Sequence, residues 1–294
     1  MLVFKPRFIT EIWFSNIIER SFLTVYYQSS YCRKIFGMIS KKFYTKIIDL
    51  TANEADIYNN FDKATKQQIR IAGGEGIIIT ENYNINQIIA FYNNFAKSKK
   101  INLLDEESIR NNPYKLFTIA KIHDETLVCH LCLIDKSKGR VRILNSGSNI
   151  TSERALIGRA NRFLHYQNMI HFKNLGFSEY DLGGYAFNTK NSCLKGINFF
   201  KDSFGGKLIM EYHYYPILIW IVFFIKEKIG KVVNRLKLSF MALNLKTIKI
   251  ITLMQLGDIY QACVYTTKLK TDFGYKSTKT LKEGINVFVK WHKT

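Results

Sequence analysis

The sequence is short of proline, of acidic residues and of long apolar runs. Only three of its 294 residues are proline, and 43 Lys and Arg outnumber 23 Asp and Glu, which leaves a net charge of +20. The longest apolar run, 216–225, is about half of the roughly 20 residues that a membrane-spanning helix needs. No signal peptide opens the chain. We therefore expect a cytoplasmic protein that does not cross a membrane.

Cysteine usage excludes a disulfide framework and argues against a metal site. The five cysteines are odd in number and irregularly spaced, which is typical of a reducing compartment. Cys129 and Cys132 have the spacing of metal ligands, but they lie in an apolar run that predicts a strand, where positions three apart face opposite sides. No second cysteine pair completes four ligands, so we expect no metal.

The excess of basic residues favours an anionic partner. A nucleotide, a phosphorylated carrier, tRNA and an acidic membrane surface all fit the charge, and the charge alone does not choose among them. The alternative is that the lysines only form a solvated surface. The sequence is also rich in Ile and Asn, so its excess of Lys can reflect a general bias in composition.

Hydrophobic periodicity predicts an α/β protein with a mixed sheet flanked by helices. A capping box of Thr51 with Glu54 opens a predicted helix over 53–72, which Gly73 and Gly74 end. Residues 1–45 hold a candidate strand at 22–27 and read as an extension that packs on the core. The expected strands are 46–50, 76–80, 115–122, 126–134, 140–145, 179–182 and 207–212, and the further helices are 86–97, 105–111, 152–175 and 192–204.

Glycine-containing motifs follow the three-strand meander. They are Gly158–Tyr166, Tyr180–Gly184 and Phe200–Gly206, and the segments Phe61–Ala64 and Gln68–Ala72 stand upstream. Together with the order of elements, they resemble the Fem-type family, the peptidoglycan interpeptide-bridge aminoacyltransferases and their relatives built on GNAT acetyltransferase domains. The resemblance covers about 47–214 and implies a GNAT-like domain over 46–214. It further implies an acyl-CoA such as acetyl-CoA, or an aminoacyl-tRNA, as acyl donor.

In such a fold the strand at 140–146 would diverge from the strand at 179–182 and open a slot for the donor, while the next helix points its N-terminus at phosphates. The usual acetyltransferase loop has Gln or Arg three residues before a glycine, whereas Arg154 stands four before Gly158, which leaves aminoacyl-tRNA open. The alternative for the arginines is a solvated helix face, and the alternative for Ser146 and Ser148 is a plain turn. The donor-binding candidates are Arg154, Gly158, Arg159, Ser146 and Ser148.

Two charged residues are the catalytic candidates. Asp181 ends a strand before two glycines, where it could act as general base, orient the acceptor, or cap the following helix. The resemblance suggests that Phe200 and Lys201 lie at the transfer centre, where the ammonium could stabilise an oxyanion. The acceptor-contacting candidates, for which half-buried packing is the alternative, are His165, Tyr166, Tyr185 and Phe200.

Two segments follow the domain. Residues 215–240 predict a basic amphipathic helix that rests on an acidic membrane surface or packs against the domain. The segment 241–294 resembles the carboxyl end of NAD-dependent nucleotide-sugar epimerases, most clearly at 254–259 and 281–291. The Gly-rich turn and the Tyr-x-x-x-Lys pair of those enzymes are missing, so it reads as a fusion remnant or a small contact lobe.

We therefore expect an acyltransferase that moves an acyl or aminoacyl group to an amine of an amino sugar nucleotide or of a lipid-linked cell-envelope glycan precursor. It would act in the cytoplasm or at the inner face of the membrane, with tRNA as a further candidate partner. The alternatives are an epimerase relative, judged from the tail alone, and an inactive fusion product or membrane-docked binding module.

Overall fold

The computed structural model describes residues 1–5, 9–81 and 83–222. All of these residues belong to one compact unit. The epimerase-like segment lies outside the described residues. So does most of the predicted basic helix, of which residues 217–222 are described and are helical. Within the described ranges, no helix is long and apolar enough to cross a membrane.

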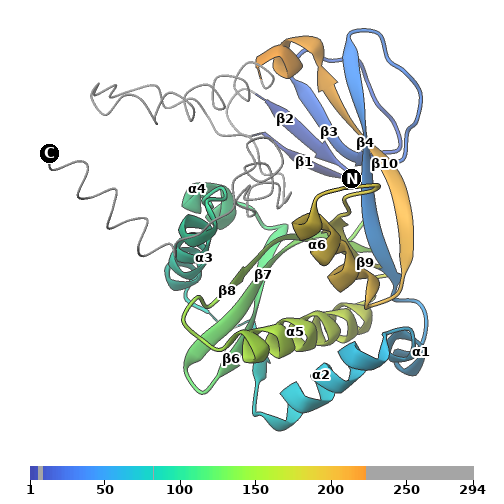
Figure 1. The fold of residues 1–294 in the computed structure, drawn as a ribbon. Coiled ribbons are helices and arrows are strands. Elements are labelled where there is room, and N and C mark those ends of the chain that lie inside the picture. Colours follow the sequence, from blue (N-terminus) through green and yellow to red (C-terminus); the bar gives the residue numbers. More distant parts are fainter. Residues whose placement is uncertain (6–8, 82, 223–294) are drawn as a thin grey trace, which may run out of the picture. The chain divides into compact units, whose positions relative to one another are not determined.

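Ten strands form a single mixed sheet in the order β1-β2-β3-β10-β4-β9-β8-β7-β6-β5 (Figure 1). The pairs β2–β3 and β8–β9 are parallel, and the other neighbours in the sheet are antiparallel. The strands are β1 (Leu2–Phe4), β2 (Thr10–Trp13), β3 (Thr24–Ser29), β4 (Met38–Asp49), β5 (Ile78–Thr80), β6 (Lys115–Ile122), β7 (Glu125–Asp135), β8 (Arg140–Ser148), β9 (Glu179–Gly184) and β10 (Lys207–Pro216).

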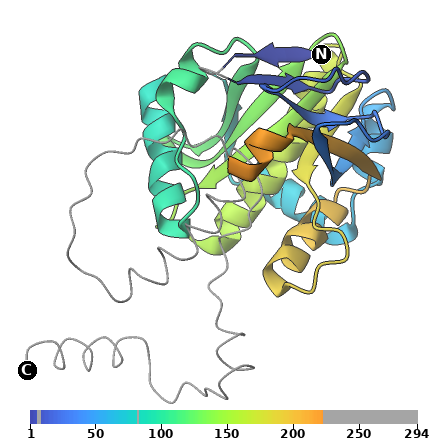
Figure 2. The ribbon, with the colours of Figure 1, turned by 90° about the horizontal axis from the view of Figure 1, so that it is seen from above.

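Helices cover both faces of this sheet. In Figures 1 and 2, α3 and α5 lie on opposite sides of the central strands. Side chains of β7 alternate between the two faces of the sheet. Cys129 and Leu131 pack in the hydrophobic cluster that contains α3, while Cys132 packs in the cluster that contains α5. The expectation that Cys129 and Cys132 face opposite sides is thus confirmed. The helices are α1 (Glu54–Asn59), α2 (Lys63–Gly74), α3 (Ile85–Lys99), α4 (Glu106–Arg110), α5 (Arg154–Asn174) and α6 (Ser192–Asp202).

The predicted α/β class, a mixed sheet flanked by helices as in a GNAT-like fold, is confirmed. The single helix expected over 53–72 is wrong, because the chain breaks it into α1 and α2. Asp62 accepts a hydrogen bond from the Thr65 N–H and so caps a new helix. The cap of α1 is Asn53 rather than Thr51, whose hydroxyl donates to Asp49 instead.

The N-terminal strands extend the sheet. β3 pairs with β10, and β10 pairs along its whole length with β4, so β1, β2 and β3 continue the sheet edge to edge. β4 itself runs across the boundary predicted at residue 45. Burial is deep at this join, since Tyr26, Tyr27, Tyr214 and Tyr215 are all buried. The extension therefore supplies side chains to the same faces as the core.

Candidate active site

The central feature is a fork in the sheet between β8 and β9. These strands pair in parallel through three residue pairs only, from Arg140 with Glu179 to Arg142 with Asp181. Beyond them β8 continues to Ser148 along β7, and β9 continues to Gly184 along β4. Two parallel strands thus diverge inside the sheet, as expected for the donor slot.

Side chains hold the fork open at Gly183. The Gly183 N–H donates to Asp181 Oδ1 at 2.8 Å, and the Gly183 carbonyl accepts from Thr45 Oγ1 at 2.9 Å. Both backbone groups are therefore satisfied without a partner on β8. Gly183 has φ +77°, and a Cβ there would lie 2.9 Å from the Ile143 carbonyl oxygen. Glycine is required at this point because the chain turns away from β8 in close contact with it.

Strand β8 carries a β-bulge in its pairing with β7, just beyond the fork. On β7, Leu131 faces Asn145 while the next residue, Cys132, faces Ile143, so one residue of β8 is extra. Bulges of this kind redirect backbone and side chains beside active sites. Asn145 Nδ2 donates to the hydroxyl of Tyr92 from α3 at 3.0 Å, which fixes this part of β8. An extended amide-containing arm could pair with the edge of β8 at the fork as an added strand.

Asp181 lies in a buried charged network that crosses five neighbouring strands. It is 0% exposed and accepts from Arg140 at 2.6 Å and from Gln28 Nε2 at 2.9 Å. Arg140 also donates to Glu211 at 2.6 Å, and Gln28 donates to the same carboxylate at 2.8 Å. Arg142 donates to Gln28 Oε1. Asp181 and Glu211 each contact the guanidinium of Arg140, and such pairing is the condition for tolerating buried charges.

The network keeps Asp181 ionised. Burial by itself would raise the pKa of its carboxyl, but the charges of Arg140 and Arg142, with hydrogen bonds from Thr45 and Gln28, lower that pKa to about 2. The same carboxylates raise the pKa of the Arg140 guanidinium against the opposing effect of its own burial. Asp181 is therefore a fixed negative charge at neutral pH.

Lys201 approaches the fork from the other face of the sheet. It lies in the last turn of α6, is buried, and donates its Nζ to the Gly184 carbonyl oxygen. A Cβ on Gly183 would lie 3.9 Å from the same Nζ. Asp181 and Lys201 are thus both beside the two glycines of β9. Their catalytic assignments stay predictions.

The predicted phosphate-binding residues gather at the end of β8 and the start of α5. Ser146 and Arg154 are exposed, and Ser148 and Gly158 are half-buried. Arg159 forms an ion pair with Glu75, to which its Nε donates at 2.8 Å.

The loop that leads into α5 carries acidic groups of its own. No side chain caps the N-terminus of α5, where Glu153 is the N-cap. Glu125 accepts hydrogen bonds from Asn149 Nδ2 at 2.7 Å and from Ser152 Oγ at 2.9 Å in the same loop. Uncapped N–H groups attract an anion, whereas a carboxylate beside them opposes one.

The predicted acceptor-binding residues separate into two groups. His165 is buried under Phe200 and Phe204, with its Nδ1 2.9 Å from the Tyr180 hydroxyl. Burial first, then the charges of neighbours including Lys201, lowers its pKa well below the usual value. Tyr166 donates its hydroxyl to Glu54 at 2.8 Å. His165 and Phe200 thus pack against each other where α5 meets α6, whereas Tyr166 lies against α1.

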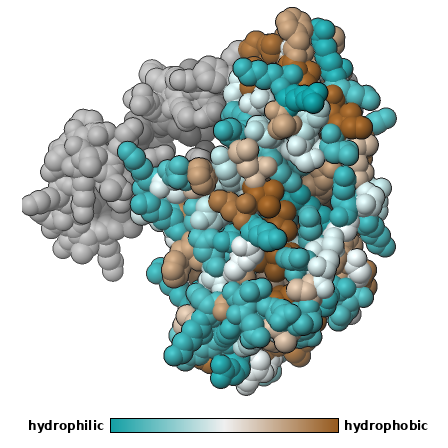
Figure 3. Space-filling view, turned by 90° about the vertical axis from the view of Figure 1, so that its right-hand side faces the viewer, coloured by the Kyte–Doolittle hydropathy of each residue, from teal (hydrophilic) through white to brown (hydrophobic). Residues whose placement is uncertain are grey.

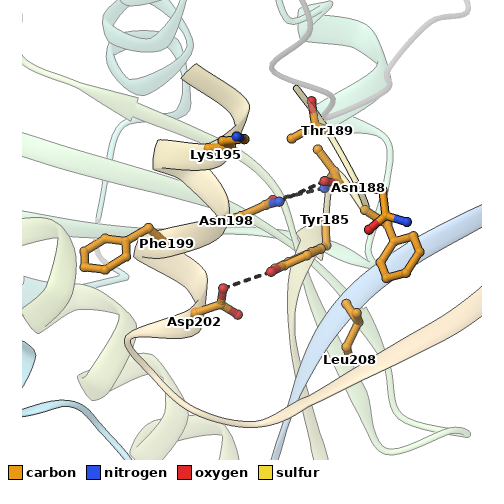
Figure 4. Close-up of a pocket in the computed structure, with 10 residues that line it drawn as sticks. Tyr185, Asn188, Thr189, Lys195, Asn198, Phe199, Asp202 and Leu208 are labelled. Carbon is orange, nitrogen blue, oxygen red and sulfur yellow. Dashed lines mark hydrogen bonds between the residues drawn. The ribbon is translucent and has the colours of Figure 1, made fainter. Parts of the chain in front are cut away.

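Tyr185 belongs instead to a hollow of about 340 Å³ beside α6 (Figure 4). Its hydroxyl donates to Asp202 at 2.8 Å, and Asn198 bridges the backbone of Ala186 with two hydrogen bonds. Burial and this contact with Asp202 raise the pKa of Tyr185 to about 12. The side chain of Lys195 also lines the hollow. The hollow as a whole offers aromatic, amide, cationic and anionic groups next to the fork.

Sequence reasoning missed the partners of Asp181. Thr45, Gln28 and Glu211 come from strands far apart in the chain, and Arg140 was taken only as the start of a strand. The available signal was the alternation in β8, where Arg140 and Arg142 stand at every second position of an otherwise apolar run. Within the described residues, no cluster of three or more His, Cys, Asp or Glu could hold a metal ion.

Comparison with known proteins gave structural likenesses at low identity. No family model matches the chain, and no curated protein matches it. FemX aligns at 13% identity over 59% of this chain and 61% of its own, with a TM-score of 0.48. The C-terminal domain of a putative lysylphosphatidylglycerol synthetase from Agrobacterium fabrum aligns at 14% identity over 65% and 67%, with 0.46. L-PGS from Bacillus licheniformis aligns at 13% over 71% and 74%, with 0.48. The chain thus spans about three fifths of the length of FemX.

Proposed function

We propose that this protein transfers an acyl or aminoacyl group to an amine, with the donor's extended arm lying in the fork between β8 and β9. The observation that supports this most is the divergence of two parallel strands immediately after Arg142 and Asp181, with Gly183 turned away from β8. The fork leaves backbone edges inside the sheet where an amide-containing or ester-linked arm can bind. Lys201 approaches the same point.

In the proposed reaction the acceptor amine attacks the donor carbonyl carbon. A C–N bond forms, the C–S bond of a thioester or the C–O bond of an aminoacyl ester breaks, and the amine proton leaves to the departing group through water. The tetrahedral intermediate carries an oxyanion, which in this proposal the ammonium of Lys201 stabilises. Binding both reactants at one fork supplies the orientation.

Asp181 acts in this proposal as a positioning residue. A general base works best with a pKa near the operating pH, and a pKa of about 2 lies far below it. Its hydrogen bond to the Gly183 N–H instead fixes the bend of β9 and, through Gly184, the carbonyl to which Lys201 donates. In this proposal Asp181 holds the fork open and does not act as the base.

Aminoacyl-tRNA is the donor that the charges favour. The carboxylate of Glu125 opposes a coenzyme A pyrophosphate at the start of α5, and Glu75 already compensates the positive charge of Arg159. A donor whose phosphates lie elsewhere on a strongly basic chain avoids this cost. The proposed acceptor is the amine of an amino sugar nucleotide or of a lipid-linked cell-envelope glycan precursor, for which the hollow beside Tyr185 offers aromatic and amide contacts.

The test is a transfer assay with the purified full chain, aminoacyl-tRNA or acetyl-CoA as donor, and UDP-amino sugars as acceptor. We expect Lys201→Met to lower kcat by roughly 100-fold or more with a small change in the donor KM, as for loss of an oxyanion donor. Lys97→Met, an exposed lysine of α3, is the control. Full activity of a folded Lys201→Met variant would contradict the assignment, and no turnover of either donor would contradict the function.

A further inference from the structure

Exposed aromatic and aliphatic side chains cluster at one end of the sheet. They come from the β2–β3 loop, the β3–β4 loop and the helical stretch 217–222. Phe36 is 84% exposed, Phe22 65% and Leu218 63%, which is unusual for side chains of this size. Figure 3 shows apolar side chains gathered toward the upper end of the face it displays. We call this set, with its neighbouring basic residues, the apolar–basic tip.

Direct contacts hold the apolar–basic tip together. The Arg20 guanidinium lies 5.1 Å from the centre of the Phe36 ring and 5.9 Å from that of Phe22, so one cation joins the two loops. The Ile217 N–H donates to the Gly37 carbonyl at 3.1 Å and brings the helical stretch beside Phe36. The exposed rings therefore form one continuous surface.

The net charge of this surface is positive. Its exposed cations outnumber the acidic Glu19, which is also exposed in the β2–β3 loop. Lys41 lies 3.9 Å from the centre of the Trp220 ring, so the cations reach the helical stretch as well. The exposed basic residues are Arg20, Arg33, Lys34, Lys41 and Lys42.

We propose that the apolar–basic tip docks the protein on an anionic phospholipid surface. Rings at loop ends are placed to enter the boundary between headgroups and acyl chains, while surrounding lysines and arginines contact lipid phosphates. This combination of protruding apolar groups and a basic rim is what an acidic bilayer binds. The proposal is independent of the transferase function, although it would place the fork near a lipid-linked acceptor.

Two other occupants fit less well. The sequence that follows Val222 is itself basic, with Lys226, Lys228 and Lys231 in its first residues, so it does not complement the charge of the tip. An RNA would use the cations, but it leaves exposed aliphatic side chains such as Leu218 without a partner. A bilayer uses both kinds of group.

The experiment is cosedimentation of the full chain with vesicles of phosphatidylcholine alone and of phosphatidylcholine mixed with phosphatidylglycerol. We expect binding to the mixed vesicles that weakens with salt. The double variant Phe22→Ser with Phe36→Ser should weaken it roughly tenfold or more, because two rings no longer enter the boundary. Ile78→Ser, which changes an equally exposed side chain on β5 at the far edge of the sheet, should leave it unchanged.

Three outcomes would overturn the proposal. They are equal binding of wild type to neutral and anionic vesicles, unchanged vesicle binding by the double variant, and a lowered melting temperature of that variant with no effect on vesicles. The last would mean that the chain's own residues cover the tip. Because no donor or acceptor enters the measurement, its failure is distinct from failure of the transfer assay.

Discussion

Replacing Asp181 by asparagine tests the account of the fork most directly. The substitution keeps the shape of the side chain but removes its charge beside Arg140 and Arg142. The pKa of the carboxyl falls from 3.8 in the unfolded chain to about 2 in the folded one. At about 1.36 kcal/mol per pKa unit this difference corresponds to about 2.4 kcal/mol of stability at neutral pH.

A second estimate comes from breaking a buried pair, which typically costs about 3–5 kcal/mol. Arg140 keeps its contacts with Glu211 in the variant, at 2.6 and 3.0 Å, so the guanidinium is not left unpaired. We therefore expect the lower value, and a loss of about 2–3 kcal/mol in the free energy of unfolding for Asp181→Asn.

The pH dependence has a definite sign. Because folding lowers this pKa, the stabilisation is present above the unfolded value of 3.8 and is lost as the pH falls toward 2. Urea unfolding of wild type and Asp181→Asn should thus differ most at neutral pH and converge in that acid window. Asp124→Asn, in the exposed β6–β7 turn, is the control and should change stability by less than about 0.5 kcal/mol. A difference below that size at neutral pH, or one that does not shrink on acidification, would refute the reasoning.

Two further perturbations probe the core. Gly206 has φ +80° and a Cβ there would lie 2.5 Å from the Ile47 carbonyl, so Gly206→Ala should cost at least about 1–3 kcal/mol in urea unfolding. Gly74→Ala, in open space on α2, should instead stabilise by up to about 1 kcal/mol, and equal effects would contradict this. Burial lowers the pKa of His130 from 6.5 to about 4, so the unfolded chain binds more protons between these values and stability should decline as the pH falls from 6.5 to 4. His130→Gln should flatten that decline by up to about 3 kcal/mol, and an unchanged slope would exclude this residue as its source.

The strands and helices of the core were largely predictable because their signals are local. The strand at 115–122 was predicted with its observed bounds, and the long helix differs from 152–175 by two residues at its start and one at its end. The error in predicting a single helix over 53–72 also has a local cause. Asp62 and Asn53 each cap a helix through a side chain that the apolar periodicity does not record.

The fork was predicted only as a consequence of the family resemblance. Nothing near Asp181 in the sequence shows that Arg140 and Glu211 surround it, since these residues lie 41 and 30 positions away. The same holds for Gln28 and Thr45. Whether a carboxylate is a base or a fixed charge depends on such neighbours, and they are the reason why we propose a positioning role for Asp181.

The sequence by itself determined the alternation of strands and helices, the two-sided burial of the sheet and the glycines at 183 and 184, because each follows from periodicity or from backbone freedom at a single residue. Tertiary structure alone decided that the N-terminal strands join the same sheet, that Asp181 is enclosed by charges, and that Lys201 approaches from the opposite face. The physical reason is that strand pairing and ion pairing act between residues far apart in the chain, and their energies depend on distance in space rather than on separation in sequence.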